Sequence, residues 1–435
     1  MLSYYLQLAQ RSLRRSWILS GLMVLAIGLG IGASMTMLTV LHVMNGDPLP
    51  GRSAELYRPY LNPLPVDFKH GNFGPDPSIN LTWPDAMALL KSHKGVRQAA
   101  IAGGSLDARS TAPGGRLQTI DGRYVTRDFF AMFEVPFLHG QAWSQTEDEQ
   151  RARVVVVTQS LARQLFGDEA AVGQSARLGG HDFRVVGVVA DWHPRPLFYA
   201  DTQERHFSAA DNFFLPLSTA ADLKLGVHTT SGWGKDDATS LTSPTVSWLQ
   251  FWVQLQSPAQ VAGYQQFLFD YAAEQKSLGR FERPPSNVKL YGLMAWLDHQ
   301  RLVPGDVQLQ AWLALGFLFV SMLNIVALLL AKFLRRGAEI SVRRALGARR
   351  NDIFVQLGIE SALIGVAGGL LGLAVAQIGL WSVRQRPDDY AHLAQMDLSM
   401  LLGTFVLAVA ASVLAGLLPA WRACRIAPAL QLKTL

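Results

Sequence analysis

The chain has 435 residues, a formal net charge of +6, and a composition in which 49% of residues are hydrophobic. The basic residues gather beside long runs without charge, which argues against a phosphate-binding face and against a nucleic-acid partner, and indicates membrane topology instead. The single cysteine, Cys424, excludes an intrachain disulfide. Any large domain outside the cytosol must therefore be stabilised by its own core.

Residues 1–41 predict an interfacial helix followed by a first membrane span. Residues 1–15 carry three arginines and no acid, and they are weakly amphipathic. Residues 16–41 have no charge and exceed the apolar stretch of about 7–15 residues in a cleaved signal peptide, so we predict an uncleaved span. Gly28 and Gly32 form a small-xxx-small pair that predicts close helix packing, although ordinary glycine frequency in membrane helices explains it equally well.

Residues 42–306 are too long and too hydrophilic to be a loop, and they predict an inserted α+β domain. Within it, Thr82 and Pro84 predict the start of a helix, and Gly179-Gly180 predicts a hairpin turn. The predicted strands are 96–102, 154–157, 176–191 (a hairpin), 246–255 and 287–291, and the predicted helices are 82–92, 158–166 and 257–276.

Three further charge-free runs predict the remaining spans, at residues 307–331, 361–383 and 398–421. The third span of the chain carries Gly365, Gly369 and Gly372, a second predicted packing face. Basic residues dominate residues 1–15, the central loop 332–360 and the tail 422–435, whereas the short loop 384–397 is slightly acidic. The sequence therefore predicts four spans with both termini in the cytosol, and charge-free spans argue against an ion-coupled carrier.

The central loop contains the stretch GAEISVRRALGARRND, which predicts a short basic helix that stops. Glu339 lies four residues before Arg343, the favourable orientation for an ion pair on a helix. Gly347 offers a left-handed position at the helix end, and Asn351 and Asp352 can cap the next helix. Such a helix suits docking onto a cytosolic partner. On composition alone, a positive loop that only fixes topology remains an equal alternative.

Two motifs resemble the MacB/FtsX-type permeases of ABC transporters. EISVRRALGARRNDI, with the following Gln356, Glu360 and GVAGGLLG, resembles the cytosolic loop and third span of that family, and GLLPAWRACRIAPALQL resembles the end of its last span. LTWPDAMALLK and DFFAMFEVPFLHGQAW resemble segments of its periplasmic domain, in which a porter unit is interrupted by a sabre subdomain. The resemblance implies a sabre-like part near residues 124–219. It also implies a coupling helix, and the residues we expect to meet the ATPase are Glu339, Arg343, Arg344, Leu346 and Gly347.

The sequence contains no G-x-x-x-x-G-K-[ST] loop and no H-E-x-x-H motif, so we expect no cofactor and expect ATP hydrolysis on a separate ABC ATPase subunit. The resemblance implies an inner-membrane subunit that relays ATP-driven motion to the periplasm, and we expect it to act in efflux or export. Its implied partners are the ATPase, a second permease copy or paralogue, and a periplasmic adaptor with an outer-membrane channel. Two alternatives stay open: lipoprotein extraction, and an FtsX-like signal relay without transport, which the large insertion disfavours.

Overall fold

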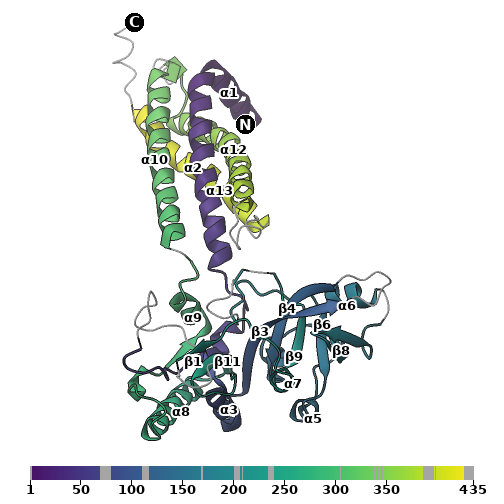
Figure 1. The fold of residues 1–435 in the computed structure, drawn as a ribbon. Coiled ribbons are helices and arrows are strands. Elements are labelled where there is room, and N and C mark those ends of the chain that lie inside the picture. Colours follow the sequence, from purple (N-terminus) through teal and green to yellow (C-terminus); the bar gives the residue numbers. More distant parts are fainter. Residues whose placement is uncertain are drawn as a thin grey trace. The chain divides into compact units, whose positions relative to one another are not determined.

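The chain divides into two compact units, which are described separately. A computed structural model describes residues 2–68, 80–109, 117–167, 170–199, 206–207, 209–233, 240–303, 305–336, 339–340, 342–343, 346–385, 396 and 398–425. The membrane unit comprises Met1–Asn45 and Val303–Leu435, and the inserted domain comprises Gly46–Leu302 (Figure 1).

The membrane unit is a helical bundle. Its described helices are α1 (Leu2–Arg15), α2 (Trp17–Met44), α10 (Gly305–Arg335), α12 (Arg350–Arg384) and α13 (Leu398–Arg425). All but α1 are long and apolar enough to cross a membrane, as the charge-free runs predicted. The two middle spans extend beyond those runs, because α10 continues to Arg335 and α12 starts at Arg350.

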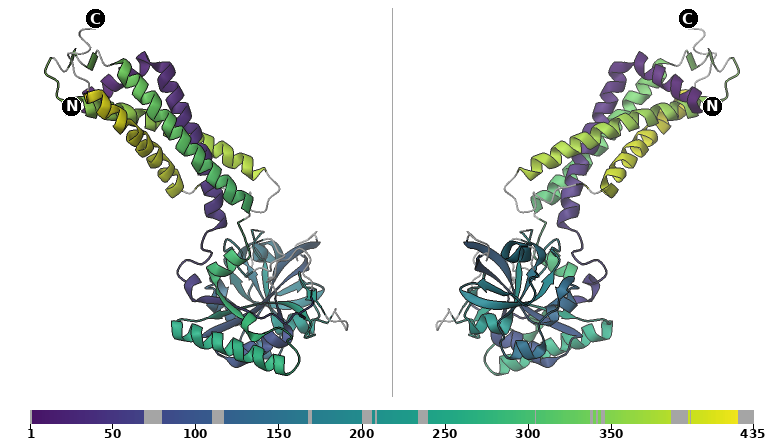
Figure 2. Two further views of the ribbon diagram at one scale, coloured as in Figure 1. Left: turned by 90° about the vertical axis from the view of Figure 1, so that its left-hand side faces the viewer. Right: turned by 90° about the vertical axis from the view of Figure 1, so that its right-hand side faces the viewer.

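Helix α2 packs against both α10 and α12, and α13 packs against α12 and α10 (Figure 2). The bundle core contains Ile27 and Ile31 of α2 with Ile325 of α10 and Ile364 of α12. The outer faces carry large exposed apolar side chains such as Trp312, which is 73% exposed. Such faces suit a lipid environment, since hydrocarbon solvates them without a protein partner.

The glycines of α2 allow α12 to approach closely. A Cβ atom added to Gly28 would lie 2.7 Å from the Leu371 side chain, and one added to Gly32 would lie 2.6 Å from Cβ of Val375. A Cβ atom on Gly372 would lie 3.5 Å from the carbonyl oxygen of Gly28, an ordinary contact distance. The first two positions therefore leave no room for a larger residue.

The other two predicted packing glycines of α12 face α13. A Cβ atom on Gly365 would lie 2.8 Å from Cβ of Ser412, and one on Gly369 would lie 3.0 Å from Cβ of Ala408. These contacts, like those of α2, lie within one chain. A contact between two permease copies through the same glycines remains a prediction.

Gly32→Ala should destabilise the membrane unit, because its methyl group would overlap Val375 and the Gly372 carbonyl. Overpacking of this kind costs about 1–3 kcal/mol, partly offset by the better helix propensity of alanine. Gly21→Ala is the matched control, since nothing lies within 4 Å of its added Cβ. Thermal denaturation in detergent should rank Gly32→Ala below Gly21→Ala, and equal midpoints would contradict the close contact.

The inserted domain is built on one long mixed sheet. The strand order along it is β12 (Lys289–Gly292), β1 (Leu56–Tyr60), β11 (Val246–Gln254), β3 (Arg97–Arg109), β4 (Leu117–Val125), β9 (Phe213–Pro216), β6 (Val154–Thr158), β8 (His181–Val189) and β5 (Phe137–Gly140). The short strands β2 (Leu81–Thr82) and β10 (Ser231–Gly232) pair with β11, and β7 (Ser175–Leu178) pairs with β3 and β8. Pairing is parallel between β4 and β9 and between β6 and β8, and antiparallel elsewhere along this order.

Helices cover both faces of this sheet, and two cores result. The helices are α3 (Trp83–Ser92), α4 (Asp128–Met132), α5 (Gln145–Glu149), α6 (Gln159–Phe166), α7 (Leu217–Asp222), α8 (Pro258–Ser277) and α9 (Leu293–His299), with 3₁₀ turns at Ser53–Glu55 and Pro285–Asn287. Ala100 and Ala102 of β3 join the core under α3, α6, α7 and α8, whereas Ala99 and Ile101 join the core with α4 and α9. Alternate strand residues point to opposite faces, so β3 serves both cores.

The structure confirms the predicted elements of this domain. Thr82 caps α3 by accepting a hydrogen bond from the backbone N–H of Asp85 at 3.4 Å, with Pro84 in the first turn. Helix α6 ends at Gly167, which has a φ of +70°. The hairpin of β7 and β8 turns at Gly179 and Gly180, both with positive φ, where the lack of a Cβ atom is an advantage.

Candidate functional site

The connection between α10 and α12, residues 336–349, contains the predicted docking stretch. Residues 339–340 and 342–343 are helical, and the backbone N–H of Leu346 donates to the Val342 carbonyl at 3.0 Å. Gly347 then adopts a φ of +100°, in the region that glycine tolerates best. The predicted short helix that stops at Gly347 is therefore present among the residues that the structure describes.

Helix α12 begins directly after this stop. Arg349 occupies the N-cap position, and its backbone N–H donates to Oδ2 of Asp352 at 3.2 Å. Asp352 thus caps the helix, as predicted, by reaching back from its first turn. Asn351 lies in the first turn of the helix, so the prediction that it also caps the helix is wrong.

The outer part of the site is a partly exposed ion pair. Arg343 Nη2 lies 2.7 Å from Glu339 Oε1, with about a third of each side chain exposed. Arg343 Nη1 also donates to Oε1 of Gln356 on α12 at 3.1 Å. The pair therefore fixes the short helix against the start of α12, although an exposed pair of this spacing contributes only about 0.3–0.5 kcal/mol.

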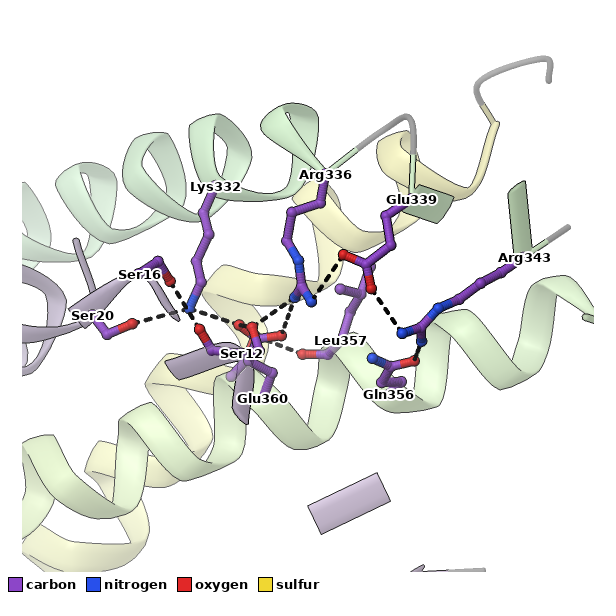
Figure 3. A network of polar contacts seen from close by, with 11 residues as sticks. Ser12, Ser16, Ser20, Lys332, Arg336, Glu339, Arg343, Gln356, Leu357 and Glu360 are labelled. Carbon is purple, nitrogen blue, oxygen red and sulfur yellow. Dashed lines mark hydrogen bonds and ion pairs between the residues drawn. The ribbon is translucent and has the colours of Figure 1, made fainter. Parts of the chain in front are cut away.

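The inner part of the site is a buried carboxylate, Glu360 of α12, which is fully buried. Lys332 Nζ lies 2.6 Å from its Oε1, and Arg336 Nη1 lies 3.1 Å from its Oε2. Ser12 of α1 donates from Oγ to Oε1 at 2.6 Å. Figure 3 shows Lys332 and Arg336 reaching from the end of α10 toward this carboxylate on α12.

Two further contacts extend these groups into one series. Lys332, 2% exposed in its side chain, donates to Oγ of Ser20 on α2 at 3.0 Å. Arg336 Nη2 lies 3.4 Å from Oε2 of Glu339, which joins the inner part to the outer part. We call this series the ionic chain; its charged members, in order, are Arg343, Glu339, Arg336, Glu360 and Lys332. Their charges alternate in sign, so each acid lies between two bases (Figure 3).

The sequence-predicted site residues divide between the ionic chain and the surface. Glu339 and Arg343 are members of the ionic chain, and Leu346 is 84% exposed. Gly347 ends the short helix. Arg344 lies outside the residues that the structure describes. The roles assigned to all five in docking remain predictions.

Sequence reasoning missed the buried half of the site. Lys332 and Arg336 are spaced i,i+4 at the end of a span, and Glu360 is the one acid in the apolar stretch LGIESALIG. A lone acid at the edge of a span, with two bases at helical spacing on another, is the signal that was available. Ser12 of α1 gives no such signal, because serine is mostly an exposed residue and does not by itself indicate a buried contact.

One serine in the inserted domain superficially resembles a catalytic residue. Ser105 of β3 donates from Oγ to Asp121 Oδ1 at 2.6 Å and lies 2.8 Å from Nε2 of His228. Asp121 lies 3.7 Å from the same imidazole nitrogen. In a catalytic triad the acid contacts the opposite nitrogen and orients the ring, so this arrangement is not a triad.

Comparisons with known proteins find a family-model match for each of the two halves of the chain. The MacB-like periplasmic core domain matches residues 20–266, and the FtsX-like permease C-terminal domain matches residues 312–428. The chain belongs to the MacB/FtsX permease family. It is thus a membrane protein in which a MacB-like periplasmic α+β domain is inserted between the first and second of four candidate membrane helices.

Several relatives carry the name "Macrolide export ATP-binding/permease protein MacB". That of Rhodospirillum rubrum is 26% identical over 449 residues, which cover 98% of this chain and 60% of the relative. That of Shigella flexneri is 24% identical over 311 residues, covering 70% of this chain and 42% of the relative. That of Bdellovibrio bacteriovorus is 26% identical over 244 residues, covering 55% and 32%. The chain therefore spans less than two thirds of the length of these relatives.

Among solved structures, the chain is similar to the periplasmic region of MacB from Actinobacillus actinomycetemcomitans. The identity is 14% and the TM-score 0.39, and the match covers 60% of this chain and 99% of that structure. A second similar structure is the extracellular domain of the ABC-type transporter YknZ from Gram-positive bacteria, with 15% identity and a TM-score of 0.32, covering 48% of this chain and 87% of that structure.

Proposed function

We propose that this permease is the membrane subunit of an ABC-type export complex and relays motion from a separate cytosolic ATPase to its periplasmic domain. The observation that carries the proposal is the connection between α10 and α12. It presents Arg343 on a short helix that contacts α12, and an exposed apolar side chain, Leu346, in the turn that ends this helix. An apolar contact flanked by arginine is typical of protein interfaces.

The orientation of the chain is part of the proposal. Seven bases and three acids occupy residues 332–360, and residues 1–15 carry three bases and no acid. Short segments rich in arginine and lysine stay on the cytosolic side of a membrane. We propose accordingly that the chain lies in the inner membrane, with both termini and the docking stretch in the cytosol and the inserted domain in the periplasm.

The partners follow from the same proposal. The proposal assigns ATP hydrolysis to a separate subunit that carries the phosphate-binding loop. A second permease copy or a paralogue completes a dimer, and a periplasmic adaptor with an outer-membrane channel completes an export pathway.

The domain boundaries, with a sabre-like part near residues 124–219, belong to this proposal as well.

Purification of the tagged full-length chain from its native membrane tests the proposal. We expect an ATP-hydrolysing subunit with a phosphate-binding loop to co-purify, and its hydrolysis rate to change when the permease is present. The remaining proteins separate the alternatives: an adaptor indicates export, a lipoprotein indicates extraction, and a cell-wall hydrolase indicates signalling. Purification without any ATPase would contradict the proposal.

The proposed orientation gives a separate prediction. In a Cys424→Ser background, an impermeant maleimide applied from the periplasmic side should label Leu138→Cys and miss Leu346→Cys until the membrane is permeabilised. Both positions are exposed in the folded chain, at 43% and 84%. The reagent should therefore reach one and not the other only because the membrane separates them. Labelling of both positions in intact membranes would contradict the four-span orientation.

A further inference from the structure

We propose that Glu360 is a positioning residue that joins the docking stretch to α1, α2 and α10, so that these elements move with α12 as one body. This inference rests on the proposed function, because it concerns how motion received at the docking stretch reaches the spans. The docking residues predicted from the sequence do not include this carboxylate.

The first argument is the number of elements that meet at one side chain. Glu360 belongs to α12, and its carboxylate accepts from Ser12 of α1 and pairs with Lys332 of α10 and with Arg336 at the end of α10. Lys332 continues to Ser20 of α2. One carboxylate therefore connects four helices of the membrane unit, directly or through one intermediate.

The second argument is the gradient of burial along the ionic chain. Glu360 and Lys332 are almost completely buried, whereas Glu339 and Arg343 are about one third exposed. The exposed end can exchange its contacts with water or with a partner at little cost. The buried end cannot, because separating Lys332 from Glu360 leaves an unpaired charge in an apolar surrounding. When a partner displaces the docking stretch, the exposed pair of Glu339 and Arg343 therefore breaks most easily. The buried pair of Glu360 and Lys332 is the last to separate.

The third argument is the connection to α1. Ser12 is buried, and its Oγ both donates to Glu360 and accepts from Arg336 Nη1 at 2.6 Å. Helix α1 is followed directly by α2, the span that leads to the inserted domain. Motion of the docking stretch thus reaches α2 at two positions, through Ser12 by way of α1 and through Ser20 directly. Both routes pass through Glu360 or its partners.

Two variants distinguish a positioning role of Glu360 from its contribution to the stability of the membrane unit. In Lys332→Met with Glu360→Gln, no buried ammonium remains, and the new amide still accepts from Arg336, which also keeps Glu339 as a partner. Replacing a buried ion pair by neutral groups is often close to neutral for stability. We expect the double variant to fold and to co-purify with its ATPase. Lys332→Met alone is the control, because Glu360 keeps its contacts with Arg336 and Ser12.

The readout is the maleimide labelling rate of Asn45→Cys, at the far end of α2, in a Cys424→Ser background. It is measured on the complete complex with its ATPase, with and without ATP and orthovanadate. We expect nucleotide to change the rate in the parent and in Lys332→Met, and we expect the change to be lost in the double variant. A double variant that binds the ATPase and keeps the full nucleotide response overturns the inference and leaves the proposed function standing. A parent without any response overturns the proposed relay itself.

Ser12→Ala keeps the test decisive if the double variant fails to assemble. It removes the hydroxyl that Glu360 and Arg336 share, yet it leaves every charge paired. We expect a smaller nucleotide response at Asn45→Cys with ATPase binding unchanged. A response equal to that of the parent would overturn the inference.

Discussion

Glu360→Gln should lower the free energy of unfolding of the membrane unit by about 3–5 kcal/mol, the usual cost of removing one partner of a buried ion pair. The substitution keeps the shape of the side chain but removes its charge. Lys332, 2% exposed in its side chain, then has no carboxylate at 2.6 Å to offset its desolvation. Arg336 is less affected, because Glu339 remains as its second partner.

Glu339→Gln is the matched control for this prediction. Its carboxylate also lies between two bases, Arg336 and Arg343, but its side chain is 35% exposed. Water and salt screen such a pair, so its loss should cost at most about 1 kcal/mol. Thermal denaturation in detergent at two salt concentrations should give a large, salt-insensitive loss for Glu360→Gln and a small, salt-sensitive loss for Glu339→Gln. Equal losses would show that burial does not distinguish the two carboxylates.

Reversing Arg343 and Arg344 to glutamate should weaken ATPase binding about thirtyfold or more and abolish the effect of the permease on ATP hydrolysis. Placing like charges against a complementary surface costs at least about 2 kcal/mol. Membrane insertion should be unaffected, because five bases still hold the connection in the cytosol: Lys332, Arg335, Arg336, Arg349 and Arg350.

Replacement of the same two arginines by lysine is the charge-matched control. It preserves the positive charge that sets topology, but it removes the planar group that donates several hydrogen bonds at once. We expect intermediate binding, with hydrolysis less stimulated than in the parent. Unchanged binding and unchanged stimulation in the glutamate variant would show that these arginines only set topology.

The parts of the fold that could be predicted from sequence depend on local chemistry. The spans follow from charge-free runs, and helix starts such as Thr82 and stops such as Gly167 and Gly347 follow from short-range backbone requirements. The pair of Glu339 and Arg343 needs only helical spacing. Each of these features is decided within about one or two helical turns.

The length of strand β3 could not be predicted from local sequence. The sequence predicted a strand over 96–102, yet the strand continues to Arg109 through Gly103 and Gly104. Glycines normally weaken a strand. Here β4 pairs with the continuation of the strand, from Ile101 to Arg109, and the Tyr124 side chain lies where a Cβ atom of Gly104 would be. The glycine is therefore required by a tertiary contact that its neighbours in sequence do not reveal.

The buried half of the candidate site is another long-range feature. Ser12 and Glu360 are 348 positions apart, and Lys332 reaches Ser20 across 312 positions. No sequence periodicity connects residues so far apart. Considered alone, each of them indicates only a helix end near the membrane surface. Only the packed helices of the membrane unit bring the charged groups of Glu360, Lys332 and Arg336 together with the hydroxyl groups of Ser12 and Ser20.

Site-specific photocrosslinking from position 346 tests the central claim, that a separate ATPase docks on the connection between α10 and α12. A photoreactive phenylalanine analogue replaces Leu346 in one variant and Trp381 in another; these side chains are 84% and 58% exposed and lie near opposite ends of α12. The account predicts an adduct with an ATP-binding chain from position 346 and none from position 381. Absence of an ATPase adduct from position 346, or equal adducts from both positions, would contradict it.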